Sequence, residues 1–261
     1  MANDYSSLGF GFTCPEDLLC FTKTHSEAVE FKTTKQGSYG YLPIGPKIEL
    51  WYYGDEKYLD PLSAELWYRS GRSLQLSDCE WLSCYENHTG IMLLNGFLDN
   101  AGFPLNIDIV NGCEFLDCTE CGLDGDSCEI DVTLFARKIS VYKNETSFDS
   151  EDLSGMAAES CIPIGAFPAD DGKDFQPSAT ALLNGVVRSI HHLINPATEL
   201  TYWNVTLDCC GIQFNAVIAD DLVENKIEIG NVIAGYYWLS GKLLKTSKTP
   251  IYQKGAYGNG E

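Results

Sequence analysis

The sequence predicts a mainly β protein in two β-rich parts. Apolar and polar residues alternate with period 2 over long stretches, while stripes with the helical period of 3.6 are scarce. Glycines interrupt the longest stretches, which is typical of strands that bulge or coil. A boundary region rich in Ser, Asp, Gly and Pro at residues 147–178 separates an acidic N-terminal part, residues 1–158, from a C-terminal part, residues 159–261.

The N-terminal part is expected to hold a meander, a hairpin and a long strand. Residues 91–110 form the hairpin, with its turn at residues 99–102. In the strand 129–143 the apolar phase changes near Leu134, which predicts a bulge. Short helices are expected at residues 15–21, 26–31 and 150–158, the last with Ser150 as its N-cap.

The C-terminal part has the clearer pattern. A strand at 181–192 carries a glycine at position 185, residues 200–218 form a hairpin that turns at Cys210-Gly211, and a long strand follows at 231–244. Alternation in the hairpin places Trp203 on the inward face and Tyr202 on the outer face. The tail beyond Lys245 has no extended apolar face and is expected to fray.

These strands resemble an OB-like barrel module over residues 178–245. The resemblance concerns strand order alone, so no family's site residues are carried over, and a β-sandwich is the alternative. The tetrapeptide LLNG occurs at 93–96 and again at 182–185, each time at the opening of a strand. Whether the two parts are duplicated barrels stays open.

Charge is the strongest compositional signal. The formal net charge is −20, and residues 1–158 hold 26 acids against 10 Lys and Arg. Binding to nucleic acid or to an anionic membrane needs cations, so both are disfavoured as partners. An acidic face for a basic protein partner is the functional interpretation, and solubility is the structural one. No apolar run is long enough to span a membrane and the first residues do not form a signal peptide, which predicts a cytoplasmic protein.

Residues 113–131 concentrate four cysteines and seven acids without Lys or Arg. Cys113, Cys118, Cys121 and Cys128 follow C-x4-C-x2-C-x6-C, a spacing that suits tetrahedral zinc imperfectly. A metal site, a reversible disulfide and reduced thiols in a loop all stay open. We expect reduced thiols, and hence no bound metal and no cofactor. The partner-binding candidates are three of the seven acids of this segment, Glu114, Asp117 and Glu120.

No catalytic set is visible in the sequence. The P-loop, the serine-hydrolase elbow and H-E-x-x-H are absent. His191 and His192 are adjacent, so on a strand they point to opposite faces, and we interpret one as packed and the other as solvated. The pairs Asp170-Asp171 and Asp220-Asp221 are interpreted as solvated turns. Most aromatic residues of the C-terminal barrel are expected in its core; Tyr202 and Tyr237 are the candidates for stacking on a ligand.

The sequence therefore predicts a non-enzymatic cytosolic binding protein, such as an acidic inhibitor or immunity-type protein, that engages a basic protein partner. The alternative is a ligand-binding or enzymatic barrel whose site is assembled from residues distant in sequence. A pocket lined by Asp, His and aromatic side chains would favour the alternative, and a broad acidic face with an exposed apolar centre would favour the protein binder. The sequence sets no oligomeric state.

Overall fold

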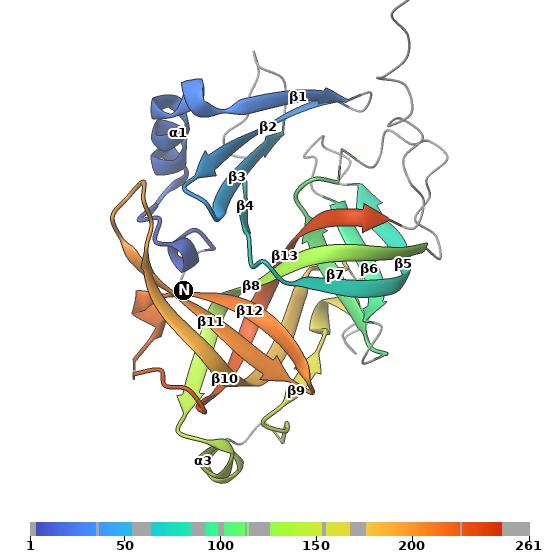
Figure 1. Ribbon diagram of the computed structural model, residues 1–261, viewed down its shortest axis with the longest axis vertical. Coiled ribbons are helices and arrows are strands. Elements are labelled where there is room, and N and C mark those ends of the chain that lie inside the picture. Colours follow the sequence, from blue (N-terminus) through green and yellow to red (C-terminus); the bar gives the residue numbers. More distant parts are fainter. Residues whose placement is uncertain are drawn as a thin grey trace, which may run out of the picture.

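The protein is mainly β, as predicted (Figure 1). The computed structural model describes residues 4–34, 37–53, 64–84, 92–98, 102–112, 114, 126–152, 155–167, 176–224 and 226–246. Its strands form one four-stranded and one nine-stranded sheet. None of the helices in these ranges is long and apolar enough to cross a bilayer.

The four-stranded sheet is an antiparallel meander built from the first part of the chain. Its strands, in order, are β1 (Glu30–Thr34), β2 (Gly37–Ile44), β3 (Ile48–Tyr53) and β4 (Glu65–Tyr68). One face carries Leu42, Leu50 and Leu66 into the main core. The other face buries a separate cluster of aromatic rings, so neither face of this sheet is simply a solvent face.

Two long antiparallel strands form the centre of the larger sheet, β8 (Asp126–Tyr142) and β13 (Val232–Thr246). On one side of them lie β5 (Ser73–Cys84), β6 (Met92–Leu98) and β7 (Pro104–Ile109), and on the other lie β10 (Thr180–Ile194), β11 (Thr201–Cys209) and β12 (Ile212–Ala219). The short strand β9 (Ser160–Ile162) adds to the edge of β10. Figure 1 shows the two groups of strands diverging from the central pair.

Strand pairing closes two five-membered circuits that share the central pair. The first circuit runs β5-β6-β7-β13-β8 and returns to β5, and only its β7–β13 pair is parallel. The second runs β10-β11-β12-β8-β13 and returns to β10, and only its β12–β8 pair is parallel. Each circuit is thus completed by a strand from the other side of the predicted boundary at residue 158.

The hairpins β6–β7 and β11–β12 confirm the two predicted hairpins. The bulge of β8 is at Arg137, which is skipped in the pairing with β13, and not at Leu134. Strand β10 bulges at Arg188. Gly185 instead allows a close approach, because a Cβ there would lie 2.9 Å from the Asp208 carbonyl oxygen. The LLNG repeats fall on β6 and β10, which are not equivalent strands of the two circuits.

Helices are short. The predicted first helix is α1 (Pro15–Thr24), and only a 3-10 turn, Ser26–Ala28, follows it. The predicted helix 150–158 is wrong: α3 spans Glu145–Glu151, because Asn144 accepts a hydrogen bond from the Ser147 N–H and caps the helix earlier. Near the N-terminus, the 3-10 turn Ser6–Leu8 is held against the second circuit by Asn195 Nδ2, which donates to the Leu8 carbonyl.

Candidate functional site

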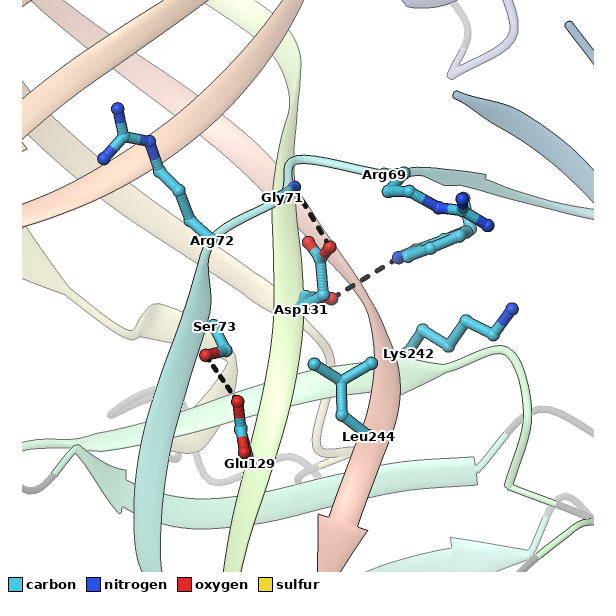
Figure 2. Close-up of a pocket in the computed structure, with 9 residues that line it drawn as sticks. Arg69, Gly71, Arg72, Ser73, Glu129, Asp131, Lys242 and Leu244 are labelled. Atoms are coloured by element: carbon cyan, nitrogen blue, oxygen red, sulfur yellow. Dashed lines mark hydrogen bonds between the residues drawn. The ribbon is translucent and has the colours of Figure 1, made fainter. Parts of the chain in front are cut away.

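A hollow of about 400 Å³ lies where β4 meets the central strands and β5. Figure 2 shows that its lining comes from three distant stretches of the chain. The lining residues are Trp67, Arg69, Gly71, Arg72, Ser73, Glu129, Asp131, Lys242 and Leu244. Several of them are charged, and a charged group can bind a ligand here only where the chain does not already engage it.

Asp131 fastens the turn between β4 and β5 to β8. Its carboxylate accepts hydrogen bonds from the Ser70 backbone N–H at 3.2 Å, the Ser70 hydroxyl at 2.6 Å and the Gly71 N–H at 3.2 Å. Gly71 has φ +75°, a conformation that favours glycine. Burial raises the pKa of Asp131, although these donors favour the charged form. The carboxylate is therefore a structural clamp.

Lys242 lies in a cage of aromatic rings. Its Nζ lies 4.6 Å from the ring centroid of Trp67, 4.9 Å from that of Trp51 and 5.9 Å from that of Tyr41. It also donates to Glu49 Oε2 at 3.0 Å. Rings and a carboxylate around an ammonium group are the chemistry of a cation site. Here the chain's own lysine fills it.

The remaining polar groups of this hollow are also engaged. Arg69 donates to Glu49 at 3.2 Å, and Glu129 accepts from Ser73 at 2.7 Å and from Lys245 at 3.1 Å. Arg72 donates to the side-chain oxygen of Gln213, and Figure 2 shows its side chain directed away from Asp131 and Leu244. We conclude that this hollow lies at the contact between the two sheets, where its polar groups hold the sheets together.

A second hollow, of about 360 Å³, lies at one end of the second circuit. It is lined by His192, Trp203, Asp220, Val223, Glu224 and Lys226. His192 and Trp203 are directly opposite in the β10–β11 register, and their rings stack at 4.2 Å with an interplanar angle of 17°. His192 Nε2 lies 2.9 and 3.2 Å from the two carboxylate oxygens of Asp220, which also accepts a hydrogen bond from the Thr201 hydroxyl.

We call the surroundings of this hollow the end surface, defined by the exposed residues Ile194, Glu199, Leu200, Asp220, Asp221 and Glu224. Ile194 pairs with Thr201, and Thr201 donates a hydrogen bond to Asp220, so Ile194 and Asp220 lie at the same end of the second circuit. Ile194 is 63% exposed and Leu200 47% exposed. No Lys or Arg occurs between Arg188 and Lys226. The end surface therefore combines exposed carboxylates with two exposed apolar side chains.

The carboxylate of Glu114, a predicted partner-binding residue, forms hydrogen bonds within the protein. Its carboxylate accepts hydrogen bonds from Lys32 at 2.9 Å, from Asn111 at 3.1 Å and from the Tyr39 hydroxyl. Burial opposes ionisation, yet these bonds lower the pKa of Glu114 below its ordinary value. The other two predicted partner-binding residues, Asp117 and Glu120, lie outside the described residues.

The structure places both predicted ligand-binding tyrosines in the core. Tyr202 is 3% exposed and packs edge-on against Tyr68 of the four-stranded sheet, so its predicted solvent-facing position is wrong. Alternation shows which residues share a face, but not whether another layer covers that face. Tyr237 is fully buried, and its ring lies over Gly235, where a Cβ would come within 2.5 Å of it. Ligand binding by these two residues stays a prediction, whereas Trp203 is the ring that lines a hollow.

The cysteine segment is only partly described. Cys113, Cys118 and Cys121 lie outside the described residues. Cys128 is buried, with its Sγ 3.1 Å from that of Cys79 on the neighbouring strand β5. Within the described ranges, no group of three or more His, Cys, Asp or Glu side chains is arranged to hold a metal ion.

Sequence reasoning interpreted one of His191 and His192 as packed, whereas both are exposed, and it placed Asp220 in a solvated turn without predicting that His192 and Asp220 meet. The β10–β11 register and the short connection after β12 bring them into contact beside Trp203. Comparison with known proteins adds no family: no protein-family model, curated protein or solved structure matches the chain.

Proposed function

We propose that this chain is a non-enzymatic cytoplasmic binding protein that engages a basic protein partner through the end surface. The observation that carries the proposal is the exposure of Ile194 and Leu200 among the carboxylates of Glu199, Asp220 and Asp221. Exposed apolar side chains supply contact area, and the surrounding charge selects the sign of the partner.

The charge of the whole molecule supports the same partner. Seven described lysines and arginines form ion pairs with the chain's own acids: Lys32, Arg69, Arg137, Arg188, Lys226, Lys242 and Lys245. These pairs compensate much of the positive charge internally, while the chain as a whole stays at −20. A field of this sign accelerates encounters with basic proteins and opposes those with nucleic acids. Asp117 and Glu120 are proposed to contribute to this field, and Glu114 is not, because it is bonded internally.

We also propose that each strand circuit is an OB-like barrel. In an OB barrel the strands close in the order 1-2-3-5-4, with strands 3 and 5 parallel. Taking β5, β6, β7, β8 and β13 as strands 1 to 5 reproduces this order, and so does taking β10, β11, β12, β13 and β8. Strand 4 of each barrel then serves as strand 5 of the other, which supports duplication.

The ligand-binding alternative has an observation in its favour. The second hollow is lined by an aspartate, a histidine and a tryptophan from distant parts of the chain. A side chain of a protein partner can itself be the ligand of such a hollow. The protein-binding proposal and the ligand-binding alternative therefore involve the same part of the molecule, the end surface.

The proposal is tested by capturing partners from cell extract on the immobilised protein at low salt, followed by rate measurements on a purified partner. We expect a basic protein whose association rate falls about tenfold or more as salt rises, with little change in dissociation rate. Ile194→Ser should speed dissociation, because the apolar contact is lost. Phe167→Ser is the matched control, since Phe167 is 51% exposed but lies outside the end surface.

The contribution of the cysteine-rich segment is tested separately. Asp117→Asn with Glu120→Gln should slow association more than Glu145→Gln with Asp149→Asn on α3, which removes the same charge elsewhere. Retention of acidic proteins only, or equal effects of Ile194→Ser and Phe167→Ser, would show that the proposed function is wrong.

A further inference from the structure

We propose that the second hollow binds the guanidinium group of an arginine side chain on the basic partner. This inference rests on the proposed function and names the chemistry of one contact within it. Four features of the hollow carry the argument: a fixed carboxylate, a flat ring surface, a second carboxylate with no partner among the described residues, and a lysine that is already paired with a glutamate.

The fixed carboxylate is Asp220. His192 Nε2 lies within 3.2 Å of both of its oxygens, and the Thr201 hydroxyl donates to one of them. These contacts set the orientation of the group before any ligand arrives. A carboxylate has about four lone-pair positions, so acceptor capacity remains for an incoming N–H donor.

The flat surface is the stacked pair His192 and Trp203. The rings are 4.2 Å apart and nearly parallel, and both residues line the hollow. Guanidinium is planar and weakly hydrated, so it stacks on such surfaces, whereas a lysine ammonium is a compact and strongly hydrated charge. The surface therefore favours arginine over lysine.

The second carboxylate is Glu224. It is exposed, and the structure shows no hydrogen bond or ion pair for it among the described residues. The lysine of the hollow, Lys226, donates to Glu228 at 2.8 Å, so its charge is already compensated. Two carboxylates thus line the hollow, and the lysine beside them is paired with Glu228, which disfavours an anionic ligand and suits the several N–H donors of one guanidinium.

The experiment uses the full chain and three blocked tripeptides, glycine-X-glycine, in which X is arginine, lysine or citrulline. Citrulline has the shape of arginine without its charge. Binding is followed by NMR at the indole N–H of Trp203, assigned with Trp203→Phe. We expect saturable shifts with the arginine peptide, at least about fivefold weaker binding of the lysine peptide, and no binding of the citrulline peptide.

Two variants separate the hollow from the general negative field. Glu224→Gln should weaken binding of the arginine peptide about tenfold, because a direct charged contact is lost. Asp221→Asn removes the same charge from the preceding 3-10 turn, Asp220–Leu222, yet Asp221 does not line the hollow, so a change below about twofold is expected. Equal losses in the two variants would overturn the inference.

Failure of the inference and failure of the proposed function are distinguishable. If the arginine peptide leaves Trp203 unshifted while a basic partner is captured and depends on Ile194, the arginine site is wrong and the proposed function stands. If the peptide saturates the Trp203 signal as expected but no basic protein is captured, the site stands as a guanidinium site and the protein-partner proposal is wrong. Equal affinity for the lysine and arginine peptides would also overturn the arginine assignment.

Discussion

Lys242 of β13 donates to Glu49 of β3 across 3.0 Å, and this pair fastens the four-stranded sheet to a strand that both circuits share. Glu49 also accepts from Arg69 at 3.2 Å and from the Trp51 indole at 3.0 Å. The carboxylate is buried, and these three donors compensate it within the fold. The hollow beside it is consequently an interface between layers of the fold.

We expect Lys242→Met to destabilise the protein by about 2–4 kcal/mol, because the cation–π contacts with Trp51 and Trp67 and one partner of a buried carboxylate are lost. Methionine keeps most of the side-chain volume. Urea unfolding measures the change. Lys226→Met is the control, since Lys226 pairs with Glu228 at the open surface, and its effect should be much smaller. Equal effects of the two changes would contradict the role of the cage.

The parts of the fold that the sequence predicted correctly are those whose residues lie close together in the chain. The hairpin β11–β12 was predictable because both of its strands and its turn lie within twenty residues. The two circuits were not predictable, since the pairs β7–β13 and β12–β8 join strands far apart in the chain and leave no local signal. The end surface was missed for a related reason: the meeting of His192 and Trp203 depends on a register that includes the bulge at Arg188.

Asp108 gives the protein a predicted pH dependence. Burial raises its pKa to about 6, although the Trp238 indole N–H, at 2.6 Å, and Arg137 favour the charged form, while Asp4 disfavours it. Burial also raises the pKa of the neighbouring Glu65, and the charge of Asp108 adds to that rise. Because the folded-state pKa of Asp108 is raised, ionisation disfavours the folded state. Its contribution to the free energy of unfolding falls as pH rises from about 4 to about 6, then stays constant.

The free energy of unfolding that Asp108→Asn adds over the parent protein should therefore be larger at pH 7 than at pH 4, by up to about 2–3 kcal/mol. Asparagine still accepts the hydrogen bond from Trp238 and carries no charge. Denaturant unfolding at the two pH values measures the difference. Glu129→Gln is a control of opposite sign. Hydrogen bonds from Ser73 and Lys245 lower the pKa of Glu129, so its stabilising contribution is present at pH 7 and is lost as pH falls. A pH-independent effect of Asp108→Asn would refute the assignment.

The metal content of the cysteine segment is a third prediction. We expect protein purified without added metal to contain no stoichiometric zinc or iron, because the spacing of Cys113, Cys118, Cys121 and Cys128 is imperfect and the segment is strongly acidic. Elemental analysis decides the question. One metal atom per chain that is lost in Cys118→Ser with Cys121→Ser would make this segment a structural metal site.

The shared strands predict that neither part of the chain folds alone. A fragment of residues 1–158 contains β5 to β8 but lacks β13, and a fragment of residues 159–261 contains β10 to β13 but lacks β8. Each would expose unpaired strand edges along an incomplete circuit. We expect each fragment to lack a cooperative unfolding transition by circular dichroism, and the mixed fragments to form a one-to-one complex that unfolds cooperatively. Cooperative unfolding of either fragment alone, near the midpoint of the intact chain, would show that its circuit does not need the borrowed strand and would favour two separate domains with a boundary near residue 158.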